Sequence, residues 1–329
     1  MSGRSTGGKG MHLDNRIHIV EVGPRDGLQN LSGFVKTEHK IGLIRRLAQS
    51  GIREIQVGAF VSPRAIPQFR DMQSMMAGLG DLRDVTLTAL VPNLQGARAA
   101  LAAGIRKFNF FFSVSRSHNL NNVRQTPEES LASLKNIRDD VLSSERDVAV
   151  RVDLAVAFGC PFEGAVKTEV ILDYLGRVVS LGFREATLCD TVGFGHPALV
   201  ESVIAACRKH FPEVVLGVHL HDTRGLALAN ALRAYDMGIR SFDAAIGGLG
   251  GCPFAPGASG NVSTEDMAFM FEAMGLNTGI DLPALLDASQ YLQDILPDAP
   301  IASALARAGL PGRAEFADPC GDRRGPSEK

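Results

Sequence analysis

Two histidines separated by one residue, His219 and His221, are the side chains in this sequence best suited to chemistry. They close the apolar run 214–220, whose composition is typical of a buried β-strand. Alternation along a strand would point both imidazoles to one face and Leu220 to the other. Two imidazoles on one face can chelate a metal ion, whereas the alternative is a hydrogen-bonded pair lining a polar rim. Other ligand types at the ends of other predicted strands favour the metal.

A second reactive segment follows the first apolar run of the chain, where Arg25 and Asp26 stand next to each other. Such a pair, seen alone, is most often a surface ion pair of little energetic consequence. It gains importance if the first and seventh strands end at the same rim of one sheet. An arginine, a carboxylate and two imidazoles would then share one site.

The third segment is a glycine-dense loop from Gly247 to Asn261 that carries one thiol, Cys252, and one amide, Asn261. Its composition suits a flexible lid whose backbone comes close to a substrate. A phosphate-binding loop with an incidental cysteine is the alternative. Cysteine is a poor choice for an exposed loop unless its reactivity is used, which favours the lid.

Eight short apolar runs, separated by amphipathic helical segments, supply the elements that must position these residues. The predicted strands are Arg16–Val22, Ile52–Val57, Val85–Val91, Lys107–Val114, Val148–Val156, Ala186–Cys189, Val214–Leu220 and Ser241–Ile246. Strand–helix units in one continuous series predict an α/β fold, a closed (β/α)8 TIM barrel whose active site lies where the strands end. An open α/β sheet is the alternative. Extra C-terminal helices are predicted at Thr264–Met274 and Leu282–Leu296.

A weak internal repeat supports the barrel. The sequence glycine, apolar residue, arginine recurs where a predicted helix ends and the second, fourth, sixth or eighth strand begins, at 51–53, 104–106, 182–184 and 238–240. Each glycine can adopt the left-handed conformation that closes a helix, and the apolar residue covers the helix end. We expect the arginines to be exposed at the bottom of the barrel.

Composition and charge limit the kinds of partner and the cellular location that we expect. With 329 residues, 45% hydrophobic content and a net charge of −2, the chain shows no bias toward a nucleic-acid or membrane partner. No apolar run approaches the roughly 20 residues of a spanning helix, and the start lacks a signal-peptide core, so a cytoplasmic location is expected. Five widely spaced cysteines indicate reduced thiols rather than a disulfide framework. The expected division is a flexible 1–15, a barrel domain 16–300 and a partly disordered tail 301–329.

Several of these segments together resemble one family, the 3-hydroxy-3-methylglutaryl-CoA lyases of the DRE-TIM metallolyase superfamily. The similar segments are Val20 to Asn30, Phe60 to Pro63, Gly159 to Gly164, His219 to Gly225 and Gly247 to Asp266. The resemblance covers Arg16 to about Leu296, and the loop around Cys252 is its most specific part.

By this resemblance the metal ligands are Asp26, His219, His221 and Asn261, Arg25 stabilises enolate charge, and Cys252 is the catalytic thiol. Gln29 and Asp190 match further positions that line the family's site. Mixed oxygen and nitrogen ligation suits Mg²⁺ or Mn²⁺. The resemblance also implies an acyl-CoA substrate and a homodimer.

The implied reaction cleaves the C2–C3 bond of a 3-hydroxy-3-alkylglutaryl-CoA, giving acetoacetate and acetyl-CoA from the methyl compound. Asp26 or a ligand histidine such as His219 accepts the proton of the substrate hydroxyl, and these alternatives stay open. A thiol of pKa about 8.5 on a closing loop, Cys252, can protonate the enolate. A related barrel aldolase or condensing synthase, and a catalytically silent binding protein, are the other functions considered.

One position departs from the family. Its signature has a glutamate at the end of the second strand, where this chain has Gln56, expected to contact the substrate. A unit charge at about 5 Å from the metal would be worth roughly 3 kcal/mol at an effective dielectric near 20. The amide therefore puts the acyl branch of the substrate in doubt more than the fold or the metal.

Overall fold

Eight parallel strands pair in sequence order and close into a barrel, with β8 hydrogen-bonded to β1. The computed structural model describes residues 15–145, 147–251 and 260–311. The strands are β1 (His18–Glu21), β2 (Glu54–Ala59), β3 (Thr86–Leu90), β4 (Lys107–Ser113), β5 (Ala149–Ala155), β6 (Glu185–Asp190), β7 (Val215–Leu220) and β8 (Ser241–Ala244). Each predicted strand overlaps one of these, and the predicted TIM barrel is confirmed.

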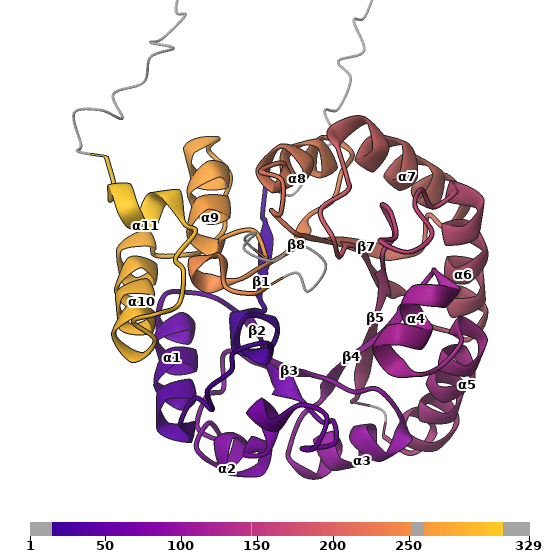
Figure 1. Ribbon diagram of the computed structural model, residues 1–329, viewed down its shortest axis with the longest axis horizontal. Coiled ribbons are helices and arrows are strands. Elements are labelled where there is room, and N and C mark those ends of the chain that lie inside the picture. Colours follow the sequence, from indigo (N-terminus) through magenta and orange to yellow (C-terminus); the bar gives the residue numbers. More distant parts are fainter. Residues whose placement is uncertain (1–14, 146, 252–259, 312–329) are drawn as a thin grey trace, which may run out of the picture.

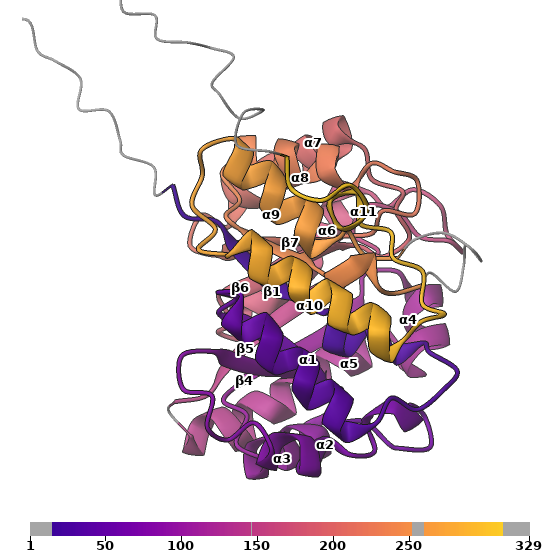
Figure 2. The same cartoon turned by 90° about the vertical axis from the view of Figure 1, so that its left-hand side faces the viewer.

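Helices surround the barrel (Figure 1). They are α1 (Thr37–Gln49), α2 (Met72–Ala77), α3 (Leu94–Ala102), α4 (Arg116–Val123), α5 (Pro127–Ile137), α6 (Thr168–Ser180), α7 (Pro197–His210), α8 (Ala227–Asp236), α9 (Thr264–Ala273), α10 (Leu282–Ile295) and α11 (Ala304–Ala308). The last three follow β8, and α10 packs along α1, as both views show (Figures 1 and 2). The two extra C-terminal helices predicted from the sequence are therefore present. Within the described chain, every helix is too short or too polar to cross a membrane.

The repeated glycines end helices as predicted. Their φ angles are +97° at Gly51, +92° at Gly104, +94° at Gly182 and +87° at Gly238, a left-handed conformation that side chains with a Cβ rarely adopt. The apolar residue after each glycine is buried. Three of the four arginines have a role that the sequence did not reveal: Nη1 donates to a carbonyl oxygen in the last turn of the preceding helix. These bonds join Arg106 to Leu101 (3.1 Å), Arg184 to Val179 (2.7 Å) and Arg240 to Tyr235 (3.0 Å).

The interior of the barrel carries charge, although apolar layers usually fill this space. Near the amino ends of the strands, Lys107 pairs with Glu54 (3.1 Å) and Glu185 (2.6 Å). Nearer the carboxyl ends, Arg151 of β5 donates two hydrogen bonds, both 2.7 Å, to Asp243 of β8. The apolar core lies instead between the strands and the surrounding helices. Buried polar side chains therefore lead from the amino ends of the strands toward their carboxyl ends.

The C-terminal segment 301–311 is held to the barrel domain through Asp266 of α9. The Asp266 carboxylate accepts hydrogen bonds from Ser303 Oγ (3.0 Å) and from the backbone N–H groups of Ala304 (2.9 Å) and Leu305 (2.7 Å). The tail predicted for 301–329 thus begins with a docked helix, α11. Residues 1–14 and 312–329 lie outside the described residues, so the expected division of the chain stays a prediction.

Candidate metal centre and active-site pocket

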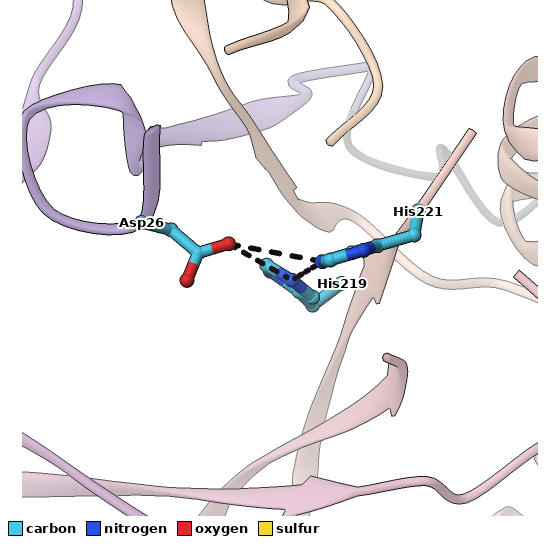
Figure 3. Close-up of side chains that lie close together, drawn as sticks. All are labelled: Asp26, His219 and His221. Carbon is cyan, nitrogen blue, oxygen red and sulfur yellow. Dashed lines mark hydrogen bonds and ion pairs between the residues drawn. The ribbon is translucent and has the colours of Figure 1, made fainter. Parts of the chain in front are cut away.

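Asp26, His219 and His221 meet at the carboxyl ends of the strands. His219 and His221 project from the end of β7, and Asp26 faces them from the turn after β1 (Figure 3). The two Nε2 atoms are 3.1 Å apart, and Asp26 Oδ2 lies 3.9 Å from His219 Nε2 and 3.7 Å from His221 Nε2. Adjacent ligands about 2.1 Å from an octahedral ion are separated by roughly 3 Å, so the two nitrogens have the spacing of neighbouring ligands.

A single turn of π-helix, Gly23–Gly27 (η1), places Asp26 and Arg25 at the rim. The carbonyl oxygen of Val22 accepts backbone bonds from Arg25 (3.0 Å) and Asp26 (2.7 Å). Both glycines are required by close packing against the segment after β8. A Cβ on Gly23 would lie 2.9 Å from Ile246 Cγ2, and one on Gly27 would lie 2.7 Å from Leu249 Cβ. Isolated π-turns are frequent at functional sites.

Asn261 joins the cluster because its backbone pairs with the end of β7, at His221. Its Nδ2 donates to Asp26 Oδ2 (2.8 Å) and to the Leu249 carbonyl (3.0 Å). Its Oδ1 is buried and accepts no hydrogen bond from the described residues. A buried oxygen without a donor is costly, and a cation beside the cluster would satisfy it. All four side chains that the resemblance implied as ligands therefore lie together.

His219 is oriented by a residue that the sequence analysis missed. Asp243 Oδ2 lies 3.3 Å from His219 Nδ1, which leaves Nε2 facing Asp26. Although burial opposes ionisation, Arg151 and His219 hold the pKa of Asp243 well below its usual range. A carboxylate on the far nitrogen is the usual partner of a metal-binding histidine. An aspartate inside the buried strand Ser241–Ala244 was the available signal.

Arg25 is clamped between two neighbours: its Nη1 donates to Asp26 Oδ1 and its Nε donates to Gln56 Oε1. Burial raises the pKa of the Asp26 carboxyl, but the charge of Arg25 and the nearby imidazoles of His221 and His219 outweigh it, and the net pKa lies well below the ordinary value. Asp26 is therefore an anion at neutral pH, a state that suits cation binding.

A pocket of about 730 Å³ opens in front of these groups. Arg25, Asp26, Gln29 and both histidines line it. Gln56 and Asp190, predicted as substrate-binding, are buried and not among its lining residues; Asp190 accepts backbone bonds from Phe194 (2.8 Å) and Gly195 (2.9 Å). This arrangement favours positioning roles for both.

Two further groups in the pocket wall were not predicted, Asp153 of β5 and Cys189 of β6. Burial raises the pKa of Cys189 well above its usual value, so it remains a thiol. Cys160, Cys189 and Cys207, the cysteines that the structure describes, are buried and unpaired, as predicted. Cys252 lies outside the described residues.

Comparison with known proteins agrees with this geometry. Residues 16–292 match the HMGL-like family. The chain is 40% identical to the hydroxymethylglutaryl-CoA lyase of Bacillus subtilis, over 86% of this chain and 94% of that protein. It is 43% identical to the cytoplasmic 3-hydroxy-3-methylglutaryl-CoA lyase of Rattus norvegicus, over 85% of this chain and 81% of that protein.

Solved structures give the same result. The Bacillus subtilis HMG-CoA lyase superposes with a TM-score of 0.86 at 39% identity, covering 90% of this chain and 99% of that one. An HMG-CoA lyase of Acinetobacter baumannii, in complex with coenzyme A and 3-methylmalate, superposes with a TM-score of 0.84 at 41% identity, covering 90% and 95%. The chain therefore belongs to the HMGL-like family, the family of the hydroxymethylglutaryl-CoA lyases.

Proposed function

We propose that this protein is a divalent-metal-dependent carbon–carbon lyase that cleaves the C2–C3 bond of a 3-hydroxy-3-alkylglutaryl-CoA, either the 3-methyl compound or a close analogue. The observation that carries the proposal is the cluster of Asp26, His219 and His221 facing the pocket with Arg25 beside it. The identity of about 40% to hydroxymethylglutaryl-CoA lyases along most of the chain supports the reaction class. No observation favours an aldolase, a condensing synthase or a silent binding protein.

Asp26, His219, His221 and Asn261 would hold Mg²⁺ or Mn²⁺. Their donor set, two imidazole nitrogens with carboxylate and amide oxygens, fits either ion. A bound ion of this kind lowers the pKa of a coordinated hydroxyl group and so assists its deprotonation. The orphaned Asn261 Oδ1 and the ionised Asp26 support this ligand set.

The remaining work falls to the protein's own side chains. Asp26 or a histidine of the pair receives the proton of the substrate hydroxyl as the C2–C3 bond breaks. Arg25, fixed by Asp26 and Gln56, faces the pocket and can stabilise the oxygen of the thioester enolate. Cys252 donates the proton that converts the enolate at C2 into acetyl-CoA, and Gln29 contacts the acyl chain.

Incubation of the purified protein and Mn²⁺ with a panel of 3-hydroxy-3-alkylglutaryl-CoA esters tests the proposal. The measured quantity is the acyl-CoA product that C2–C3 cleavage releases. 3-Methylmalyl-CoA should be tested beside this panel, because an Acinetobacter relative was solved with coenzyme A and 3-methylmalate. We expect metal-dependent acetyl-CoA release from at least one glutaryl ester, and its abolition by a chelator and by His219→Ala. Failure of the metal-loaded protein to cleave any ester would refute the lyase. A homodimer and a cytoplasmic location complete the proposal, and sedimentation and cell fractionation test them.

A further inference from the structure

Asp153 is a carboxylate in the pocket wall that none of the steps above uses. Its residue is only 6% exposed, and its Oδ1 lies 2.9 Å from Nε of Arg151. Arg151 already holds a bidentate partner in Asp243, with both bonds 2.7 Å. Asp153 is therefore a second carboxyl group beside one buried guanidinium. Burying a charged group costs free energy unless a partner compensates it. The position of Asp153 in the wall of the pocket therefore suggests a role in the active site.

The position that lacks the expected carboxylate, Gln56, is connected to Asp153 through two side chains. Asn109 of β4 fits its surroundings when its Oδ1 accepts from Arg151 Nε (2.9 Å) and Nη2 (3.1 Å) and from Gln56 Nε2 (3.2 Å). Gln56 Oε1 meanwhile accepts from Arg25. Gln56 therefore connects Arg25 to Asn109, and Asn109 connects to Arg151.

The upper barrel holds charged side chains of both signs. Arg25 and Arg151 are its buried or half-buried cations, and Asp26, Asp153 and Asp243 are the anions against them. Burial and the charge of Asp243 raise the pKa of Asp153, and the charges of Arg151 and, to a smaller extent, Arg25 oppose this rise. Arg25 contacts Asp26 of η1 and the neutral amide of Gln56 on β2, and it lines the same pocket as Asp153 of β5.

We propose that Asp153 is a positioning residue of the active site: from β5 it supplies the negative charge that Gln56 does not supply from β2. Acting through Arg25 and Arg151, it sets the field at the metal centre and the placement of the Arg25 guanidinium. The catalytic part of this inference rests on the proposed lyase function; the metal-binding part does not. Gln56→Glu would restore the glutamate of the family signature. It would also add a fourth carboxylate to the cluster of Asp26, Asp153 and Asp243.

A double-mutant cycle of Gln56→Glu and Asp153→Asn tests the proposal. Each single change should lower kcat by about tenfold or more, because it alters the negative charge near Arg25. The double variant restores that charge, and its kcat should return to within about threefold of the unchanged protein. Mn²⁺ affinity, measured by calorimetry, gives an independent readout. Asp153→Asn should weaken binding by roughly three- to tenfold, Gln56→Glu should tighten it to a similar extent, and the double variant should cancel both.

Glu185→Gln is the matched control, since it also turns a strand carboxylate into an amide but at the opposite end of the barrel, beside Lys107. It should leave Mn²⁺ affinity and kcat unchanged. If Asp153→Asn does not fold, Asp153→Ser replaces it in the cycle. Effects on kcat that simply multiply in the double variant would overturn the proposal, and so would an Mn²⁺ affinity that either single change leaves unchanged. A protein that binds Mn²⁺ with the predicted cancellation but cleaves no ester would instead refute the lyase function alone.

Discussion

Replacing Asp243 by asparagine should weaken metal binding although Asp243 itself does not face the metal centre. Its Oδ2 lies 3.3 Å from His219 Nδ1, and its two oxygens accept from Arg151 at 2.7 Å. Asparagine keeps the shape but removes the charge and one acceptor. His219 then loses the partner that holds its ring with Nε2 toward Asp26, and Arg151 loses half of its compensation.

Two magnitudes follow from these contacts. Loss of an outer partner of a metal-binding histidine typically costs 10- to 100-fold in metal affinity, which corresponds to about 1.4–2.8 kcal/mol. Breaking a buried ion pair typically costs about 3–5 kcal/mol of folding stability. Because Asp153 remains 2.9 Å from Arg151, we expect a cost near the lower end of that range.

Calorimetric Mn²⁺ titration of metal-free protein and urea unfolding measure the two effects separately. Glu54→Gln is the matched control, since Glu54 is also buried, ion-paired with Lys107 at 3.1 Å and hydrogen-bonded to His18 at 3.0 Å, but at the other end of the barrel. It should lower stability and leave Mn²⁺ affinity unchanged. Equal weakening of Mn²⁺ binding in both variants would mean that general loosening of the barrel, and not the orientation of His219, explains the result.

Three further changes have expected outcomes. Arg25→Met should lower kcat by about 100-fold or more with little change in Mn²⁺ binding, and a variant that only raises KM would make Arg25 a substrate-binding group. Cys252→Ser should lose most activity, alkylation should inactivate the unchanged enzyme unless substrate is bound, and full activity in the serine variant would make the thiol incidental. Glu21 is fully buried, and burial raises its pKa from 4.5 to about 7. Between pH 4.5 and about 7 the folded state therefore binds more protons than the unfolded chain. The free energy of unfolding should fall by up to about 3 kcal/mol as the pH rises through this range. Glu21→Gln should flatten this dependence in urea unfolding at a series of pH values, and an unchanged slope would contradict the assignment.

The elements of the barrel could be predicted because their signals are local. Each strand is a short apolar run, and the glycines at 51, 104, 182 and 238 mark helix ends through a backbone conformation that belongs to single residues. The pair His219 and His221 could be placed on one face for the same reason, since strand alternation needs no knowledge of distant neighbours.

The partners of the site residues could not be predicted, because they come from strands far apart in the sequence. Arg151 and Asp243 are separated by 92 positions, and nothing near either residue identifies the other. A charge inside an apolar strand, as in Arg151-Val152-Asp153, does indicate an inward polar side chain. It does not say whether that side chain meets a cation, an anion or solvent.

These connections suggest why an amide at position 56 is compatible with activity. Hydrogen bonds and ion pairs lead from Gln56 through Asn109 and Arg151 to Asp243, and from Gln56 through Arg25 to Asp26. A residue in such a network is tuned to its partners, so a lost carboxylate at one position need not mean a lost function when another anion stands nearby. Asp153 is that anion. If Gln56 stands where the family has a glutamate, as the resemblance implies, the proposed role of Asp153 explains the change as a redistribution of charge within the site rather than a loss of function.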